Sequence, residues 1–142
     1  MKDQDQDICI VGGAGHVGLP LALAFANAGQ RVLIHDVNVA AMDVIKGGTL
    51  PFVEYGAQPL LQQALSDERL SFSSDPRDIA RARHVIVAIG TPVDEYLNPK
   101  LRALLDLFKQ LRPHLRASQT IIIRSTVYPR TCRQVEHTTG AS

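Results

Sequence analysis

Three closely spaced glycines constrain the fold of this chain more than any other feature. Gly13, Gly15 and Gly18 follow a short apolar run that begins at Ile8, and small and aliphatic residues continue at helical spacing up to Leu23. A G-x-G-x-x-G pattern between a strand and a helix is typical of a turn that binds the phosphates of a dinucleotide. This stretch therefore predicts a strand, a tight turn and a helix.

Each of the three glycines has its own predicted role. Gly13 is expected to make the sharp turn out of the strand, Gly15 to let a pyrophosphate approach the backbone, and Gly18 to let the helix lie close to the sheet. The phosphates would lie at the helix N-terminus, where free N–H groups and the helix dipole favour negative charge. Gly12 allows the pattern to start one residue earlier, but the later register includes all three glycines.

The next strand-like run, RVLIHD, ends in the acid Asp36. Asp36 lies 18 residues beyond Gly18, close to the spacing of about 20 residues expected for the carboxylate that binds the adenosine ribose 2′-hydroxyl. A carboxylate there would repel a 2′-phosphate, so the sequence favours NAD over NADP as the cofactor. The alternative is that Asp36 caps the helix that begins near Asn38.

Composition limits the other classes of function. The chain has 142 residues, 45% of them apolar, which suits one domain of residues 1–142 with a buried core. Its 15 basic and 14 acidic residues give a net charge of +1, so neither a nucleic acid nor a membrane partner is expected. No apolar run is long enough to span a membrane, and the polar start MKDQDQD lacks the apolar core of a signal peptide. We therefore expect a cytoplasmic protein.

The two cysteines, Cys9 and Cys132, have neither the C-x-x-C spacing of a metal site nor the pattern of a disulfide framework. No bound metal is expected. Cys9 lies in the first apolar run and is expected to pack in the core.

Strand-like and helix-like patterns alternate along the chain, which predicts a Rossmann-type, doubly wound α/β fold with a mostly parallel sheet of about five strands. After the first unit, strands are expected at residues 31–36, 70–73, 84–90 and 120–123. Helices are expected at residues 38–45, 59–66, 101–115 and from 131 to 137, with a short one opened by Asp75 and Pro76. The segment TLPFVEYG at 49–56 is expected to be a packed connection.

Two threonines follow expected strands at their carboxyl ends, where the ligand crevice of an open parallel sheet lies. Thr91 follows the run HVIVAIG, and Thr126 follows the strand at 120–123. Thr91 is therefore a candidate cofactor-binding residue. Its position fits a cap of the next turn equally well.

Four separated motifs give the chain a resemblance to a known family: GGAGHVGLPLA, IHDVN, VAIGTPVDEYLNP and IIIRSTVYPRT. From about Ile8 to Val135 it resembles the N-terminal, NAD-binding domain of the UDP-glucose/GDP-mannose dehydrogenase family. These nucleotide-sugar dehydrogenases oxidise a sugar C6 alcohol to a uronic acid. DEYLNP and RSTVYP are most similar to the bacterial and archaeal branch that acts on UDP-N-acetylhexosamines.

The resemblance implies which residues bind NAD. It places Asp36 on the adenosine ribose, Thr91 beside the dinucleotide, and Thr126 near the nicotinamide, where it would support a catalytic water or carboxylate. It places five residues of the turn at the pyrophosphate: Gly13, Gly15, His16, Val17 and Gly18.

Two positions depart from the family pattern. Ala41 stands where a lysine often supports the adenosine ribose, and Arg130 stands where glycine usually follows the proline of S-T-V-x-P-G-T. The first departure would remove one charge-assisted contact, and the second puts a bulky side chain at a turn.

The resemblance also implies that catalysis needs segments outside these residues. In the family, a central and a C-terminal domain supply the catalytic cysteine and lysine and most of the nucleotide-sugar site, and Cys132 lacks the glycine-rich motif of the family nucleophile. The sheet would be one strand short of the full domain. We therefore expect a fragment that binds NAD without catalysis, taken from an enzyme that oxidises a UDP-sugar with two NAD⁺ and is a homodimer at full length.

Two other interpretations stay open. The chain could be a stand-alone NAD-binding module without chemistry of its own. It could also belong to a dehydrogenase of the 6-phosphogluconate type, which shares the glycine turn, although the G-T-P and S-T-V-Y-P motifs disfavour that assignment.

Overall fold

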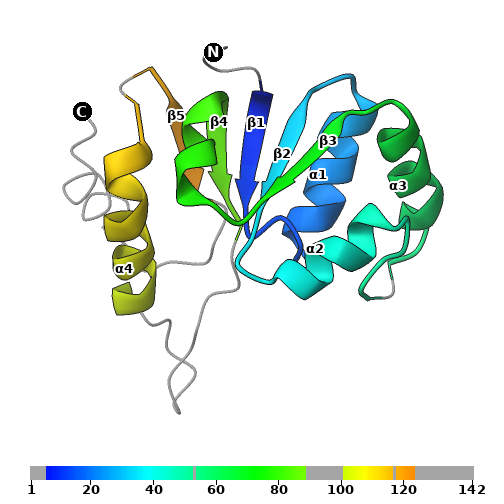
Figure 1. Cartoon of the computed structure of the whole chain (residues 1–142), viewed down its shortest axis with the longest axis horizontal. Coiled ribbons are helices and arrows are strands. Elements are labelled where there is room, and N and C mark those ends of the chain that lie inside the picture. The colour runs from blue at the N-terminus through cyan, green and yellow to red at the C-terminus, as the bar shows by residue number, and fades with distance from the viewer. Residues whose placement is uncertain (1–5, 53, 89–100, 117, 124–142) are drawn as a thin grey trace.

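A computed structural model describes residues 6–52, 54–88, 101–116 and 118–123 of the chain. Within these ranges, one parallel sheet of five strands has the order β3-β2-β1-β4-β5 (Figure 1). The strands are β1 (Gln6–Val11), β2 (Val32–His35), β3 (Leu70–Ser73), β4 (Ala82–Val87) and β5 (Thr120–Ile123). The predicted doubly wound α/β fold is confirmed.

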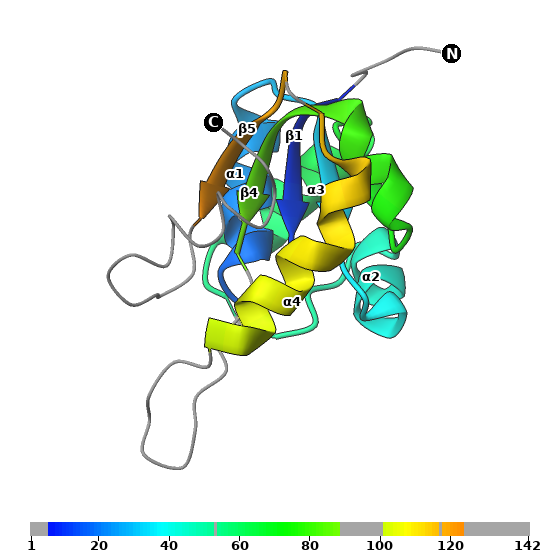
Figure 2. The ribbon, with the colours of Figure 1, turned by 90° about the vertical axis from the view of Figure 1, so that its left-hand side faces the viewer.

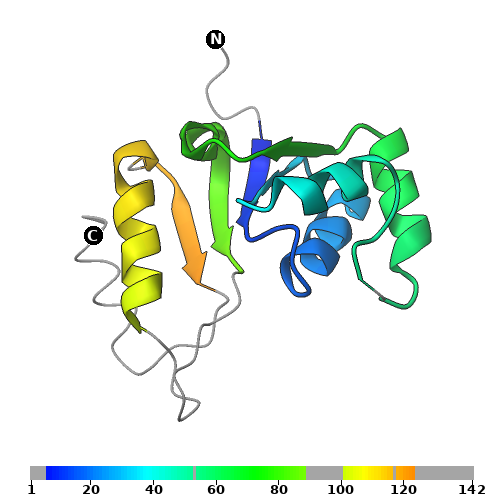
Figure 3. The same ribbon diagram turned by 60° about the horizontal axis from the view of Figure 1, so that its bottom comes forward.

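The helices lie on both faces of this sheet. They are α1 (Gly18–Asn27), α2 (Val39–Lys46), α3 (Ala57–Ser66), the 3₁₀ helix η1 (Pro76–Arg81), α4 (Leu101–Leu111) and the 3₁₀ helix η2 (Arg112–His114). The first core cluster joins the sheet to α1, α2 and α3, and the second joins it to η1 and α4. Figure 3 shows α4 (yellow) beside β5 (orange) and away from α2 and α3, and Figure 2 shows α1 and α4 on opposite sides of the strands.

Strand β1 is covered on both faces, as its continuous apolar sequence predicts. Ile8 and Ile10 pack in the first core cluster, whereas Cys9 and Val11 pack in the second. Cys9 is fully buried, which confirms its predicted place in the core, and burial raises the pKa of its thiol to about 12. A thiol held in this neutral form is a poor nucleophile and a poor metal ligand.

The carboxyl ends of the central strands lie at the same height. Val11 of β1 pairs with His35 of β2 on one side and with Val87 of β4 on the other. The turns that leave β1 and β2 therefore emerge at one edge of the sheet, beside the end of β4. This is the edge at which open parallel sheets bind their ligands.

Some element boundaries differ from those predicted. Helix α3 begins at Ala57 rather than Pro59, because proline is tolerated within the first helical turn, where N–H groups have no helical partner. Helix α4 ends at Leu111, and a 3₁₀ turn that contains Pro113 follows. The residue before a proline disfavours α-helical geometry, so the helix stops short of residue 115.

The other predictions for helices and connections have mixed outcomes. The short helix opened by Asp75 is of the 3₁₀ type, and the Asp75 carboxylate accepts a hydrogen bond from the Arg77 amide at 2.9 Å. Leu50 and Phe52 pack against the first core cluster, which confirms a packed connection for the first half of segment 49–56, whereas Tyr55 is 95% exposed. The helix expected from 131 to 137 lies outside the described residues. No helix in the described ranges is long and apolar enough to cross a membrane.

Candidate cofactor site

The glycine turn is fastened to the end of strand β2. The amides of Gly12 and Gly13 donate hydrogen bonds to the carbonyl oxygen of His35, at 2.8 and 3.3 Å. Gly12 has a φ of +84°, a left-handed conformation that favours glycine. The sharp turn therefore occurs at Gly12, one residue before the glycine that the sequence analysis assigned to it.

Gly13 is required for close packing instead. A Cβ atom at Gly13 would lie 2.7 Å from Cγ2 of Ile34 and 2.9 Å from the carbonyl oxygen of Ile10. Both distances are shorter than van der Waals contact, and the second involves backbone. The absence of a side chain at Gly13 is what allows the turn to lie against the neighbouring strand.

Gly18 and Gly15 differ in what surrounds them. A Cβ atom at Gly18 would overlap the carbonyl oxygen of Gly12 and lie 2.9 Å from the Gly12 carbonyl carbon, so Gly18 lets the first turn of α1 contact the glycine turn. At Gly15, the carbonyl oxygen of Gly12, at 3.3 Å, is the one described atom that a Cβ would meet within 4 Å. Apart from the residues next to it in the chain, no other described atom lies within 4 Å of that Cβ position.

Unpaired backbone donors lie beside this open space. Among the described residues, no acceptor is in hydrogen-bonding geometry with the amides of His16, Val17 or Gly18. Val17, at the N-cap position of α1, makes no side-chain cap. Free amides at a helix N-terminus, next to a glycine without contacts on its open side, fit a bound phosphate group.

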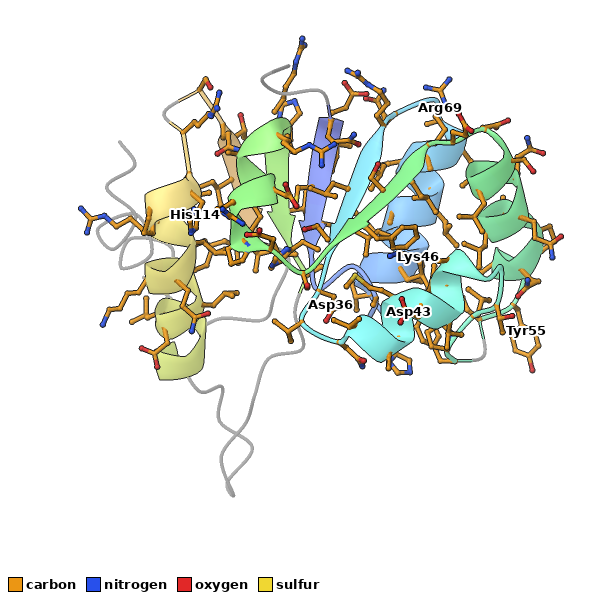
Figure 4. The ribbon with its side chains drawn as sticks, viewed as in Figure 1. Asp36, Asp43, Lys46, Tyr55, Arg69 and His114 are labelled. Carbon is orange, nitrogen blue, oxygen red and sulfur yellow. The ribbon has the colours of Figure 1, made fainter. Side chains whose placement is uncertain are left out.

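Asp36 lies next to the glycine turn, where β2 passes into α2 (Figure 4). Its Oδ2 accepts a hydrogen bond from the Ala14 amide at 3.1 Å, and its Oδ1 accepts one from the Asn38 amide at 2.9 Å. Asn38 itself caps α2, because its side-chain oxygen accepts a bond from the Ala41 amide at 3.0 Å. A carboxylate can accept about four hydrogen bonds, so Asp36 retains capacity for a hydroxyl donor.

His35 lies directly before Asp36, and the sequence analysis did not consider it. The side chain is buried, and its Nδ1 has no hydrogen-bond partner among the described residues. Burial lowers the pKa of His35, although the negative charges of Asp36, Asp78 and Asp75 act in the opposite direction. The signal available in the sequence was one titratable residue at the end of the apolar run VLIH.

A second unpredicted feature connects the turn to segment 49–56. The imidazole of His16 stacks on the ring of Phe52, with 4.3 Å between the ring centroids and 22° between the ring planes. His16 is exposed, and Phe52 is partly buried against the first core cluster. This contact brings the connection between α2 and α3 to the edge of the candidate site.

Most of the remaining residues singled out from the sequence cannot be placed relative to the glycine turn and Asp36. Thr91, Thr126, Arg130 and Cys132 lie outside the described residues. Ala41 is in the first turn of α2 and is partly buried against the first core cluster. Within the described ranges, no three His, Cys, Asp or Glu side chains gather as they would around a metal ion.

Comparison with known proteins gives a consistent picture. The sequence profile described as the UDP-glucose/GDP-mannose dehydrogenase family, NAD binding domain, matches residues 6–141. UDP-glucose 6-dehydrogenase TuaD of Bacillus subtilis is 31% identical over 116 residues, which are 81% of this chain and 25% of that protein. UDP-N-acetyl-D-mannosamine dehydrogenase of Methanococcus aeolicus is 30% identical over 131 residues, which are 90% of this chain and 29% of that protein.

A solved structure agrees with these sequence matches. A ternary complex of GDP-mannose dehydrogenase from Pseudomonas aeruginosa superposes with a TM-score of 0.85 at 28% identity, and the match covers 95% of this chain and 33% of that one. The chain thus spans between a quarter and a third of the length of these proteins. It belongs to the UDP-glucose/GDP-mannose dehydrogenase family, as an NAD-binding domain of that family.

Proposed function

We propose that this chain is the cofactor-binding part of a nucleotide-sugar 6-dehydrogenase, an enzyme that oxidises the C6 alcohol of a UDP-sugar to the acid with two NAD⁺. The names of the relatives support this class of reaction, since they include a UDP-glucose 6-dehydrogenase and a UDP-N-acetyl-D-mannosamine dehydrogenase. Because the chain spans at most a third of these proteins, the oxidation belongs to the whole enzyme.

One observation carries the proposal for this part. The hydrogen bond of 3.1 Å from the Ala14 amide to Oδ2 of Asp36 joins the glycine turn to the carboxylate at the end of the next strand. A phosphate-binding turn and a ribose-binding carboxylate are the two halves of an adenosine diphosphate site. Here they lie in direct contact, and the carboxylate is held by the amides of Ala14 and Asn38.

The proposed roles follow from this arrangement. The open side of Gly15 and the free amides of His16, Val17 and Gly18 would hold the pyrophosphate. The Asp36 carboxylate would accept the hydroxyls of the adenosine ribose. As the family resemblance implies, Thr91 would lie beside the dinucleotide. Thr126 would lie near the nicotinamide and support a catalytic water or carboxylate.

When bound, NAD⁺ supplies the hydride acceptor, and the domain binds and orients it. The Asp36 carboxylate also sets the choice of cofactor. A 2′-phosphate in place of the 2′-hydroxyl would bring two negative groups together and lose the hydroxyl donor. The chain should therefore bind NAD in preference to NADP.

Calorimetric titration with NAD⁺ and NADP⁺ tests this proposal. We expect NADP⁺ to bind at least about tenfold more weakly, a difference of about 1.4 kcal/mol. The Asp36→Asn variant, which removes the charge and keeps the shape, should narrow that difference. Equal affinities for the two cofactors in the original chain would contradict the role of Asp36. If neither NAD⁺ nor NADP⁺ binds, the proposed function is overturned.

The proposal also implies that the chain alone does not oxidise a sugar. Correct placement of reactants can contribute about 7–11 kcal/mol to lowering a barrier, and the substrate-binding part is assigned to the rest of the enzyme. Absorbance of NADH should stay at the no-sugar level with UDP-glucose, UDP-N-acetylglucosamine or UDP-N-acetylmannosamine. Sugar-dependent NADH formation that survives repurification would place the active site within these residues.

A further inference from the structure

The imidazole of His16 is positioned at the phosphate-binding turn by its contact with Phe52. His16 lies between Gly15, which is open on its outer side, and the free amides of Val17 and Gly18. Its ring is stacked on Phe52 at 4.3 Å. Phe52 in turn packs against the first core cluster, so the surface that carries the imidazole is itself anchored.

The imidazole has no other partner among the described residues. No hydrogen bond or ion pair within the described ranges involves either ring nitrogen of His16. Stacking occupies the face of the ring and leaves its nitrogen-bearing edge available. An exposed imidazole held by its face alone can still donate to an anion from a protonated nitrogen.

Positive charge is scarce on the two segments that meet at the contact of His16 with Phe52. Residues 12–20 contain no lysine or arginine, and residues 36–56 contain Lys46 alone. The Nζ atom of Lys46 lies 5.5 Å from the centroid of the Phe72 ring, in a cation–π contact. The acidic side chains on the same segments are Asp36, Asp43 and Glu54. Figure 4 shows Asp43 and Lys46 on α2 and Asp36 before it.

On these two segments, a pyrophosphate bound at the turn would meet neutral amide donors and more acidic than basic side chains. Residues 12–20 carry one ionisable side chain, that of His16, and histidine is the residue type that most often couples ligand binding to a proton. A nearby anion favours the charged form of an imidazole, so the binding of a phosphate and the binding of a proton reinforce each other.

We propose that His16, positioned by stacking on Phe52, is a proton-linked phosphate contact, so that the chain takes up a proton when it binds NAD(H). This inference rests on the proposed function and adds a side chain to the backbone amides as the source of phosphate affinity. The consequence is that NAD(H) affinity rises as the pH falls from 8 to 6. Where one proton is taken up, the affinity changes by up to about tenfold per pH unit.

Calorimetry with NAD⁺ in buffers of different ionisation enthalpy measures the proton uptake directly. At pH 7, the observed binding enthalpy should vary with the buffer enthalpy, with a slope that corresponds to a fraction of one proton. Adenosine, which lacks the phosphates, should bind without uptake. A zero slope with NAD⁺ would overturn the inference and leave the proposed function standing, whereas failure of NAD⁺ to bind at any pH would overturn both.

Three variants identify the residue responsible. His16→Tyr keeps a ring for Phe52 but cannot be protonated in this range, so proton uptake should disappear and the pH profile of NADH fluorescence titrations should flatten. Phe52→Leu keeps the imidazole but removes the stacking partner, and uptake should decrease. His114→Gln, a change on η2 beside α4 (Figure 4), should keep the original profile.

His35 is the main competitor, because it lies next to Asp36 and is buried. Proton uptake that persists in His16→Tyr and disappears in His35→Leu would assign the linkage to His35 and overturn the inference. Circular dichroism of each variant verifies that the fold is retained. Uptake that disappears in His16→Tyr and persists in His35→Leu is the result we expect.

Discussion

The carboxyl end of β1 is built differently on its two sides. Toward β2, the glycine turn is fastened by bonds from the amides of Gly12 and Gly13 to the His35 carbonyl and from the Ala14 amide to Asp36. Toward β4, the link at this edge is the bond of 2.9 Å from the Ala88 amide to the Val11 carbonyl oxygen. Beyond it, no residue of the turn bonds to the described part of β4.

This difference follows from the topology of the sheet. Helix α1 packs on the face that α2 and α3 also cover, whereas α4 packs on the opposite face. The helices α1 and α4, which come after β1 and β4 in the chain, thus lie on opposite faces, and a ligand crevice forms between such strands. The described hydrogen bonds thus hold the turn on its β2 side, and the proposed cofactor would bind toward β4.

The three glycines can be assigned to these two sides. Gly13 and Gly18 allow close packing within the chain, because a Cβ at either one would overlap backbone or a core side chain. Gly15 meets one described atom and is otherwise open where a Cβ would lie. Substitutions at Gly18 and Gly15 should therefore affect different properties, the first folding and the second binding.

Gly18→Ala should have the largest effect on stability, because it disrupts the turn that is hydrogen-bonded to the end of β2. The added Cβ overlaps the Gly12 carbonyl, which is backbone and cannot rotate away. We expect the free energy of unfolding in urea to fall by about 3 kcal/mol, the upper end of the usual cost of overpacking.

Gly47→Ala is a matched control for Gly18→Ala. At Gly47, φ is −76° and a Cβ would lie 3.4 Å from the nearest atom, the carbonyl oxygen of Val44. Alanine fits such a site, so the stability should stay equal or rise by up to about 1 kcal/mol. Equal urea midpoints for both variants would show that the turn shifts to accept a side chain at Gly18.

Gly15→Val should have the next largest effect, on the open side. The isopropyl group would fill the space proposed for the pyrophosphate, and we expect NADH affinity to fall about 100-fold, or about 2.7 kcal/mol. The urea midpoint should change less than in Gly18→Ala. NADH fluorescence enhancement that is retained in a folded Gly15→Val chain would mean that the phosphates lie elsewhere.

The sequence predicted those parts of the site that depend on local spacing. The G-x-G-x-x-G pattern and the distance to Asp36 follow from the geometry of one βαβ unit, so they can be read without a structure. The position of the left-handed residue within the pattern could not be read. Whether Gly12 or Gly13 adopts the left-handed conformation depends on how the turn meets Ile34 in the next strand, which is a tertiary contact.

The contact of His16 with Phe52 was out of reach for the same reason. The two residues are far apart in the sequence, and the helix α1, strand β2 and helix α2 that separate them determine whether they meet. An aromatic residue next to proline in an irregular segment was the available signal. This signal supported a packed connection, and Leu50 and Phe52 do pack against the first core cluster. It did not indicate that Phe52 has a partner in the glycine turn.

The smallest expected effect concerns the buried histidine on the fastened side. Burial lowers the pKa of His35 in the folded chain below its usual value of 6.5, so the unfolded chain binds this proton more readily. Its contribution to stability is fully present above pH 6.5 and is lost as the pH falls through the lower folded value. Between pH 7.5 and 5.5, the free energy of unfolding in urea should fall more for the original chain than for His35→Leu. Asp7, whose pKa Arg31 lowers below 3.8, loses its contribution only at more acidic pH and does not interfere. If the free energy of unfolding falls equally in the two chains, His35 is protonated equally well in the folded and unfolded states. The folded chain would then accommodate a charged imidazole next to Asp36.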